Sequence, residues 1–284
     1  MTAGVLIYNK GHKMVVRVAV CLHTLNKHYD GPVTVLADGA DACEALAPIC
    51  KRFGAQMVEP DFPRVLTGKN GILLNKCQLH LVTPYDVSLL IDADCTVHGD
   101  VTPMIEAAAK AEFSVAQFTD WEIKKKMLKR VMRWEGKVSD AMLSRAIAYP
   151  AAINTGVYGF TRDSLLMRDW FDIAAKGKED IFIPDEGAAQ VMLPSYHHKL
   201  MPPVFNVSCR YGKPEHFADA RVTHWHGRKH CRFEDDNKTH KYNSYIWYKE
   251  FEEIRERREV KKWIRKDKQL RHYLPTWDAV KGNA

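Results

Sequence analysis

The sequence predicts an α/β fold with a mainly parallel central sheet flanked by helices. In the first half of the chain, short apolar runs such as GVLIY (4–8) and PVTVLA (32–37) alternate with helix-length segments at 14–25 and 40–53. Strands separated by helices form β-α-β units, whose strands are parallel. The apolar runs have no polar face, which is typical of strands that helices cover on both sides.

The same alternation continues along the chain. The further strands that we expect are 55–58, 87–91, 113–118, 157–160 and 220–224. The further helices that we expect are 75–82, 101–111, 121–137, 165–175 and 186–193. Charged and aromatic residues then dominate, so we expect a core domain at 1–230 and a basic helical appendage at 231–284 that packs on it.

The composition is that of a globular protein. Hydrophobic residues make up 46% of the 284 residues, which excludes wholesale disorder, and a net charge of +7 favours a polyanionic partner. The seven cysteines include no C-x-x-C pair, so they fit neither a disulfide framework nor a zinc site. The N-terminal residues do not resemble a signal peptide, and no run is apolar enough to span a membrane. We therefore expect a cytoplasmic protein, with peripheral membrane contact as an alternative.

Two carboxylates lie at the end of a predicted buried strand. Asp92 and Asp94 directly follow VSLLI (87–91) and are separated by one alanine. Ligands of open α/β sheets bind at the carboxyl ends of the strands, and paired carboxylates suit magnesium or manganese. The alternative is a solvated loop, because D-x-D triplets are common in loops. The preceding strand favours the metal site.

A histidine-rich segment follows the last predicted strand. His224 ends that strand, and an imidazole there can complete the coordination of a cation that carboxylates already hold. Gly227 would let the backbone approach a phosphate, and Lys229 would neutralise a diphosphate leaving group. The alternative is a surface loop rich in histidine.

Two further polar segments are candidates for the cleft. Asn154, Thr155 and Gly156 form a turn before a predicted strand, where short polar side chains suit hydrogen bonds to sugar hydroxyls. Asp185 and Glu186 lie at the start of a predicted helix. A carboxylate there can bind a hydroxyl or act as a base, although Asp185 can equally be an N-cap.

These motifs, in this order, resemble the glycogenin-like and bacterial lipopolysaccharide-type family of GT-A glycosyltransferases. The resemblance covers residues 4–230 and includes IDAD, NTG, DEGAAQ and HWHGRKH. It implies a GT-A fold in which segment 119–150 is an insert on the acceptor side. It further implies a nucleotide-sugar donor, with a uridine diphosphate sugar as our expectation, and a divalent cation, Mn²⁺ or Mg²⁺. The residues that it implies for the cation are Asp92, Asp94 and His224. The residues that it implies for the donor are Tyr8, Lys76, Gly227 and Lys229, to which we add Asp92, Thr155 and Gly156.

We therefore expect a metal-dependent glycosyltransferase. Asp185, Glu186 and Asn154 are its candidate catalytic residues, and retaining and inverting stereochemistry both stay open. The alternatives are a non-catalytic nucleic-acid-binding protein, which the charge favours, and a sugar-phosphate nucleotidylyltransferase. The latter would need a glycine- and arginine-rich loop after the first strand, which YNKGHKMVVR lacks.

The expected acceptor is a polyanion. In the predicted helix 121–137, Ile123, Met127, Leu128 and Val131 share one face, and the cations share the opposite face. Those cations are Lys126, Lys129, Arg130 and Arg133. Two acceptors fit: DNA with hydroxylated bases, as in DNA modification by a virus in its host's cytoplasm, and a phosphorylated cell-surface glycan. For the glycan, we expect four apolar side chains to enter lipid: Trp247, Phe251, Trp263 and Ile264.

Overall fold

The computed structural model describes residues 1–65, 70–118, 127–209, 214–225 and 246–267, together with 270–271, 274–275 and 277–278. The chain forms two compact units. Unit 1 comprises Met1–Leu6, Pro60–Ile91 and Thr102–Asn206. Unit 2 comprises Ile7–Glu59, Asp92–Val101 and Val207–Ala284. Strand β1 (Ala3–Lys10) contributes residues to both units.

The central sheet is mainly parallel, as the sequence predicts. From one edge to the other, its strands are β3 (Gln56–Val58), β2 (Val33–Asp38), β1 (Ala3–Lys10), β4 (Val87–Ile91), β7 (Ile153–Thr161), β6 (Phe113–Gln117) and β8 (Lys199–Met201). The pairs β2 with β3, β1 with β4, and β6 with β8 are parallel. Strand β7 is antiparallel to both of its neighbours, β4 and β6. A smaller sheet in unit 2 has the order β5 (Cys95–Val97), β10 (Val222–His224), β9 (Val207–Ser208).

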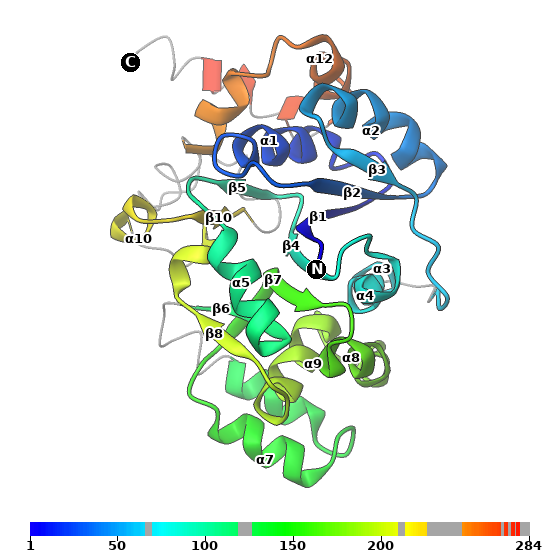
Figure 1. The fold of residues 1–284 in the computed structure, drawn as a ribbon, viewed down its shortest axis with the longest axis vertical. Helices are drawn as coiled ribbons and strands as arrows, with labels where there is room; N and C mark the ends of the chain where they lie inside the picture. The colour runs from blue at the N-terminus through cyan, green and yellow to red at the C-terminus, as the bar shows by residue number, and fades with distance from the viewer. Residues whose placement is uncertain are drawn as a thin grey trace. The chain divides into compact units, whose positions relative to one another are not determined.

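Unit 2 contains the N-terminal helices and the small sheet (Figure 1). Its elements after β1 are α1 (Val15–Leu25), β2 (Val33–Asp38), α2 (Ala40–Phe53), β3 (Gln56–Val58), β5 (Cys95–Val97), β9 (Val207–Ser208), α10 (Pro214–Ala218), β10 (Val222–His224) and α12 (Arg258–Ile264). Residues 246–252 are also helical. Helix α2 ends at Gly54, whose φ of 70° is the left-handed conformation that favours glycine after a helix.

Unit 1 contains the other strands of the central sheet and the helices of the middle of the chain (Figure 1). Its early elements are α3 (Gly71–Asn75), η1 (Lys76–Gln78), α4 (Leu79–Val82), β4 (Val87–Ile91), α5 (Thr102–Ala111) and β6 (Phe113–Gln117). Its later elements are η2 (Met132–Trp134), α7 (Asp140–Ala148), β7 (Ile153–Thr161), α8 (Leu165–Lys176), α9 (Pro184–Met192), η3 (Leu193–Ser195), β8 (Lys199–Met201) and η4 (Pro203–Phe205).

Some local predictions need correction. The helix expected at 75–82 is divided into α3, η1 and α4. Helix α7 was not expected, although Ser139 caps it by accepting a hydrogen bond from the Met142 N–H. In the expected helix 121–137, residues 121–126 lie outside the described residues and 127–131 are helical. Leu128 is 43% exposed, so the expected apolar face is wrong at that position.

The aromatic residues of the C-terminal segment are buried. Trp247 stacks on Phe251 with ring centroids 5.3 Å apart, and Tyr248 stacks on Trp277 at 5.0 Å. Trp247, Phe251, Trp263 and Ile264 are at most 9% exposed, so the expectation that they enter lipid is wrong. Throughout the described residues, no helix has the length and apolar character needed to cross a membrane.

Candidate active site

Asp92, Asp94 and His224 come together in unit 2. The His224 Nε2 lies 3.3 Å from the Asp94 Oδ1 and 3.8 Å from the Asp92 Oδ2. The His224 side chain is 5% exposed, whereas those of Asp92 and Asp94 are 23% and 14% exposed. Two carboxylates that reach solvent therefore face a buried imidazole.

Strand pairing sets the distance between these side chains. In the small sheet, His224 of β10 is the register partner of Cys95 of β5, which directly follows Asp94. The next residue, Trp225, donates its backbone N–H to the Asp94 carbonyl at 2.9 Å and its indole N–H to the Thr96 Oγ1 at 2.8 Å. The two segments are thus held side by side by backbone and side-chain hydrogen bonds.

The donor set fits a divalent cation. Two ligand atoms that share a cation, each about 2.1 Å from it, are about 3 to 4 Å apart, and the spacings at His224 fall in this range. Carboxylate oxygens and an imidazole nitrogen suit Mn²⁺ or Mg²⁺. The Cys95 thiol lies in the same group of neighbouring ligand atoms as Asp94 and His224. Sequence reasoning missed Cys95, although it adjoins the D-x-D triplet.

A second buried thiol, that of Cys21, contacts the backbone of Asp92. The Cys21 Sγ in α1 donates to the Asp92 carbonyl oxygen at 3.9 Å. Burial, with the negative charges of Asp94 and Asp92, raises the pKa of the Cys21 thiol well above its usual value. Cys21 therefore stays a neutral thiol near pH 7 and contacts the loop without adding charge to it.

The end of β1 presents a polar group within unit 2. The Tyr8 hydroxyl donates to the Asp38 Oδ2 at 2.6 Å, and the Lys10 ammonium lies 3.4 Å from the same oxygen. The Gly11 N–H donates to the Asp38 carbonyl at 3.2 Å. Asp38, which ends β2, was not a predicted site residue. Its position at the carboxyl end of a parallel strand was the available signal.

In unit 1, Asn154 and Glu186 are joined by a network of hydrogen bonds. The Asn154 Nδ2 donates to the Glu186 Oε2 at 2.5 Å. The Asn154 Oδ1 accepts from the Gly156 N–H and from the Asn206 Nδ2, both at 3.0 Å. Hydrogen bonds at both its nitrogen and its oxygen therefore orient the side-chain amide of Asn154. From the sequence we expected this amide to bind sugar hydroxyls, and we did not expect these protein partners.

Arg130 extends this network. Its Nη1 donates to the Glu186 Oε1 at 2.7 Å, so each oxygen of the Glu186 carboxylate accepts a hydrogen bond. The Glu186 side chain is 6% exposed and that of Arg130 is 34% exposed. The sequence placed Arg130 on a cationic surface for a polyanion. This prediction is wrong for Arg130, because its guanidinium forms an ion pair with the buried carboxylate of Glu186.

The predicted donor-site and catalytic residues of unit 1 that remain, Lys76, Thr155, Gly156 and Asp185, are buried. The Lys76 Nζ donates to the Thr155 carbonyl at 3.1 Å, and Lys76 and Thr155 are 8% and 3% exposed. Asp185 is 2% exposed, and its carbonyl accepts from the Trp170 indole N–H at 2.8 Å. The N-cap of α9 is Ile183, so the N-cap alternative for Asp185 is wrong. Gly227, Lys229 and Lys126 lie outside the described residues.

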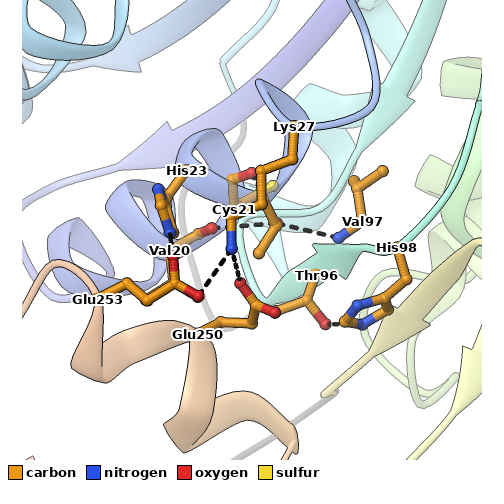
Figure 2. Close-up of polar contacts among 10 residues, drawn as sticks. Val20, Cys21, His23, Lys27, Thr96, Val97, His98, Glu250 and Glu253 are labelled. Atoms are coloured by element: carbon orange, nitrogen blue, oxygen red, sulfur yellow. Dashed lines mark hydrogen bonds and ion pairs between the residues drawn. The ribbon is translucent and has the colours of Figure 1, made fainter.

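A second group of ionisable side chains lies elsewhere in unit 2. Figure 2 shows the Lys27 Nζ between the carboxylates of Glu250 and Glu253, at 2.7 and 2.9 Å. The His23 Nε2 lies 3.1 Å from the Glu253 Oε2. Burial and the Lys27 charge lower the pKa of His23, and the hydrogen bond from Lys27 lowers the pKa of Glu253. The Lys27 ammonium thus supplies the positive charge at this group.

The sequence matches no protein-family model and no curated protein. The fold, in contrast, is similar to solved glycosyltransferases. The bifunctional glycosyltransferase WbbM superposes with a TM-score of 0.58 at 12% identity, covering 88% of this chain and 51% of its own. The present chain thus spans about half of WbbM.

Two further glycosyltransferases of similar fold are covered over a larger share of their length. The galactosyltransferase LgtC, in complex with donor and acceptor sugar analogs, has a TM-score of 0.56 at 12% identity, covering 87% of this chain and 95% of its own. The glycosyltransferase GlyE of Streptococcus pneumoniae TIGR4 has a TM-score of 0.58 at 13% identity, covering 94% of this chain and 64% of its own.

Proposed function

We propose, from the GT-A-type glycosyltransferase fold of this chain, that it transfers a sugar from a nucleotide diphosphate donor to an acceptor hydroxyl. In this reaction the bond between the anomeric carbon and the diphosphate breaks. A bond from the acceptor oxygen to that carbon forms, and the acceptor hydroxyl loses its proton. The observation that carries the proposal is that the His224 Nε2 lies within 3.8 Å of a carboxylate oxygen of Asp92 and of Asp94.

Asp92, Asp94 and His224 would hold a divalent cation, with Mn²⁺ as the first candidate. When bound, the cation would supply positive charge to the diphosphate leaving group. The donor that we propose is a uridine diphosphate sugar. Tyr8 lies at the end of β1, and its hydrogen bond to Asp38 supports a donor site that uses this strand end. We also assign Gly227 and Lys229 to the diphosphate.

We assign Glu186 to positioning Asn154. Both of its oxygens accept hydrogen bonds, from Arg130 and from Asn154, which supports an orienting role over that of an acceptor base. A retaining reaction needs no strong base, so this assignment favours retention. Asp185 remains the alternative base for inversion.

The test of the metal site is calorimetry of UDP binding with and without MnCl₂. We expect binding that depends on manganese in the wild-type protein and in Thr223→Val, whose buried position adjoins His224. We expect no manganese-dependent binding of UDP in Asp94→Asn, because this variant loses a charged ligand. In His224→Ala we expect weakened binding that a higher manganese concentration partly restores. Equal binding with and without manganese would contradict the proposal, as would no binding under either condition.

A polyanionic acceptor, either DNA with hydroxylated bases or a phosphorylated glycan, is the further part of the proposal. The exposed side chains of Lys129 and Arg133 support it. The test is binding of duplex DNA and of anionic vesicles across a salt series, because contacts with phosphates weaken steeply with salt. The variant is Lys129→Glu with Arg133→Glu, and the charge-matched control is Lys110→Glu with Lys176→Glu. Equal effects of the two pairs would contradict a specific surface.

A further inference from the structure

Phe182 is an exposed aromatic side chain in unit 1. It lies between α8 and α9 and is 62% exposed. Its neighbours in sequence are more buried: Ile181 is 3% exposed, and Pro184 is buried within the first turn of α9. A single exposed apolar residue needs no functional explanation by itself. Two further observations distinguish Phe182 from the other exposed apolar residues of this chain.

The first observation is the backbone of the next residue. Ile183 has φ 56° and ψ 68°, the left-handed conformation. This conformation is rare for a β-branched residue and is energetically unfavourable. Residues in this state are enriched at binding and catalytic sites. In the sequence, Ile183 lies between the exposed Phe182 and the buried residues Asp185 and Glu186, which are 2% and 4% exposed.

The second observation is the contact between Phe182 and Arg130. The Arg130 Cζ lies 5.8 Å from the centroid of the Phe182 ring. The same guanidinium donates to the Glu186 Oε1 at 2.7 Å, and Glu186 in turn accepts from Asn154. Phe182 is therefore linked through Arg130 to Glu186, a candidate catalytic residue of the proposed transferase.

We propose that Phe182 and Arg130 form a subsite for the acceptor saccharide. A pyranose ring has an apolar C–H face, which gains free energy by burial against an aromatic ring. Its hydroxyl groups accept hydrogen bonds, and a guanidinium has five N–H groups in a plane, of which Arg130 directs one to Glu186. The inference rests on the proposed glycosyltransferase function and favours the glycan over the DNA acceptor.

The experiment is saturation-transfer-difference NMR of the full chain with methyl β-glycosides of glucose, galactose and N-acetylglucosamine. The variants are Phe182→Ala and Phe182→Trp, and the control is Leu165→Ala, which removes a 46% exposed apolar side chain of the same unit. We expect transfer to the C–H protons of at least one glycoside in the wild type. In Phe182→Ala we expect affinity about tenfold weaker, because the apolar contact is lost. Phe182→Trp and Leu165→Ala should retain binding.

Three results would overturn the subsite: no transfer to any glycoside in the wild type, equal affinity in Phe182→Ala, or equal losses in Phe182→Ala and Leu165→Ala. Circular dichroism of each variant shows whether the fold is retained. The manganese-dependent UDP binding of Phe182→Ala is measured in parallel. If that binding is retained while the affinity for glycoside is unchanged, the subsite is wrong and the donor site stands. If UDP binding fails in the wild type, the proposed function itself is wrong.

Discussion

The backbone N–H of Trp225 donates a hydrogen bond of 2.9 Å to the backbone carbonyl of Asp94. This bond joins the residue after His224 to the backbone of Asp94, whose carboxylate His224 faces. The Trp225 side chain is fully buried and its indole N–H also donates to the Thr96 Oγ1. The spacing of the candidate metal ligands is therefore set by a residue that is not itself a ligand.

Trp225→Phe should weaken manganese binding while retaining the fold. The substitution keeps an aromatic ring but removes the indole donor to Thr96, a net loss of about 1 kcal/mol of stability. Isothermal calorimetry of Mn²⁺ binding and urea unfolding measure the two effects.

Thr223→Val is the matched control for Trp225→Phe. Among the described residues, the buried Thr223 hydroxyl has no hydrogen-bond partner. Its replacement by valine should leave stability equal or about 1 kcal/mol higher, with manganese affinity unchanged. If Trp225→Phe binds manganese as tightly as Thr223→Val does, the positioning role of Trp225 is wrong.

Arg130 and Glu186 should show energetic coupling. Arg130→Ala removes the partner of a buried carboxylate and should destabilise the protein by about 1–3 kcal/mol. This loss is smaller than for a fully buried pair, because solvent partly screens the exposed Arg130 guanidinium. Glu186→Gln in the same chain should restore part of this loss, since the remaining amide is uncharged. A double-mutant cycle from urea unfolding measures the coupling. Lys137→Ala, which breaks an ion pair with the exposed Asp180, should cost less than about 1 kcal/mol.

Stability should fall between pH 6.5 and pH 4 because of His98. Burial lowers the pKa of His98 from 6.5 to about 4. In this interval the unfolded chain binds a proton that the folded chain does not, so stability is present above pH 6.5 and decreases as the pH falls. The loss is at most about 3 kcal/mol. His23 and Glu253, whose pKa values are also lowered, act in the same direction.

His98→Gln isolates the contribution of His98. Glutamine retains a side-chain amide near the Thr96 hydroxyl, to which the His98 Nε2 is hydrogen-bonded at 2.8 Å (Figure 2). The urea midpoint of the variant should depend less steeply on pH between 6.5 and 4 than that of the wild type. Parallel curves for the two proteins would show that His98 does not carry the effect.

The longer elements of the fold follow from sequence pattern, and the shortest ones do not. Helix α1 and strand β4 consist mostly of apolar residues, which made both predictable. Strands β5 and β9 have three and two residues. Such runs are too short to show a period, so the small sheet that brings His224 to Asp94 was not predicted as a sheet. Only its last strand was expected.

Some residues of the candidate site could likewise be predicted from the sequence, and others could not. Asp92 and Asp94 were predictable because they directly follow a buried strand. The contact of Glu186 with Arg130 joins residues 56 positions apart, and that of Asn206 with Asn154 joins residues 52 positions apart. A helical period assigns a side chain to a face but does not identify its partner. The charge of Arg130 was therefore assigned to solvent and to a polyanion.

The pairing of Lys27 with Glu250 has a consequence for the order of folding. These residues are 223 positions apart, and unit 2 is assembled from three separate stretches of the chain. At a synthesis rate of about 5–20 residues per second, Lys27 precedes Glu250 from the ribosome by roughly 10 to 45 s. During that interval Lys27 lacks its ion-pair partners, and loop closure over such a distance slows folding. Unit 2 therefore completes its fold late in synthesis, when the aromatic residues near Glu250 become available.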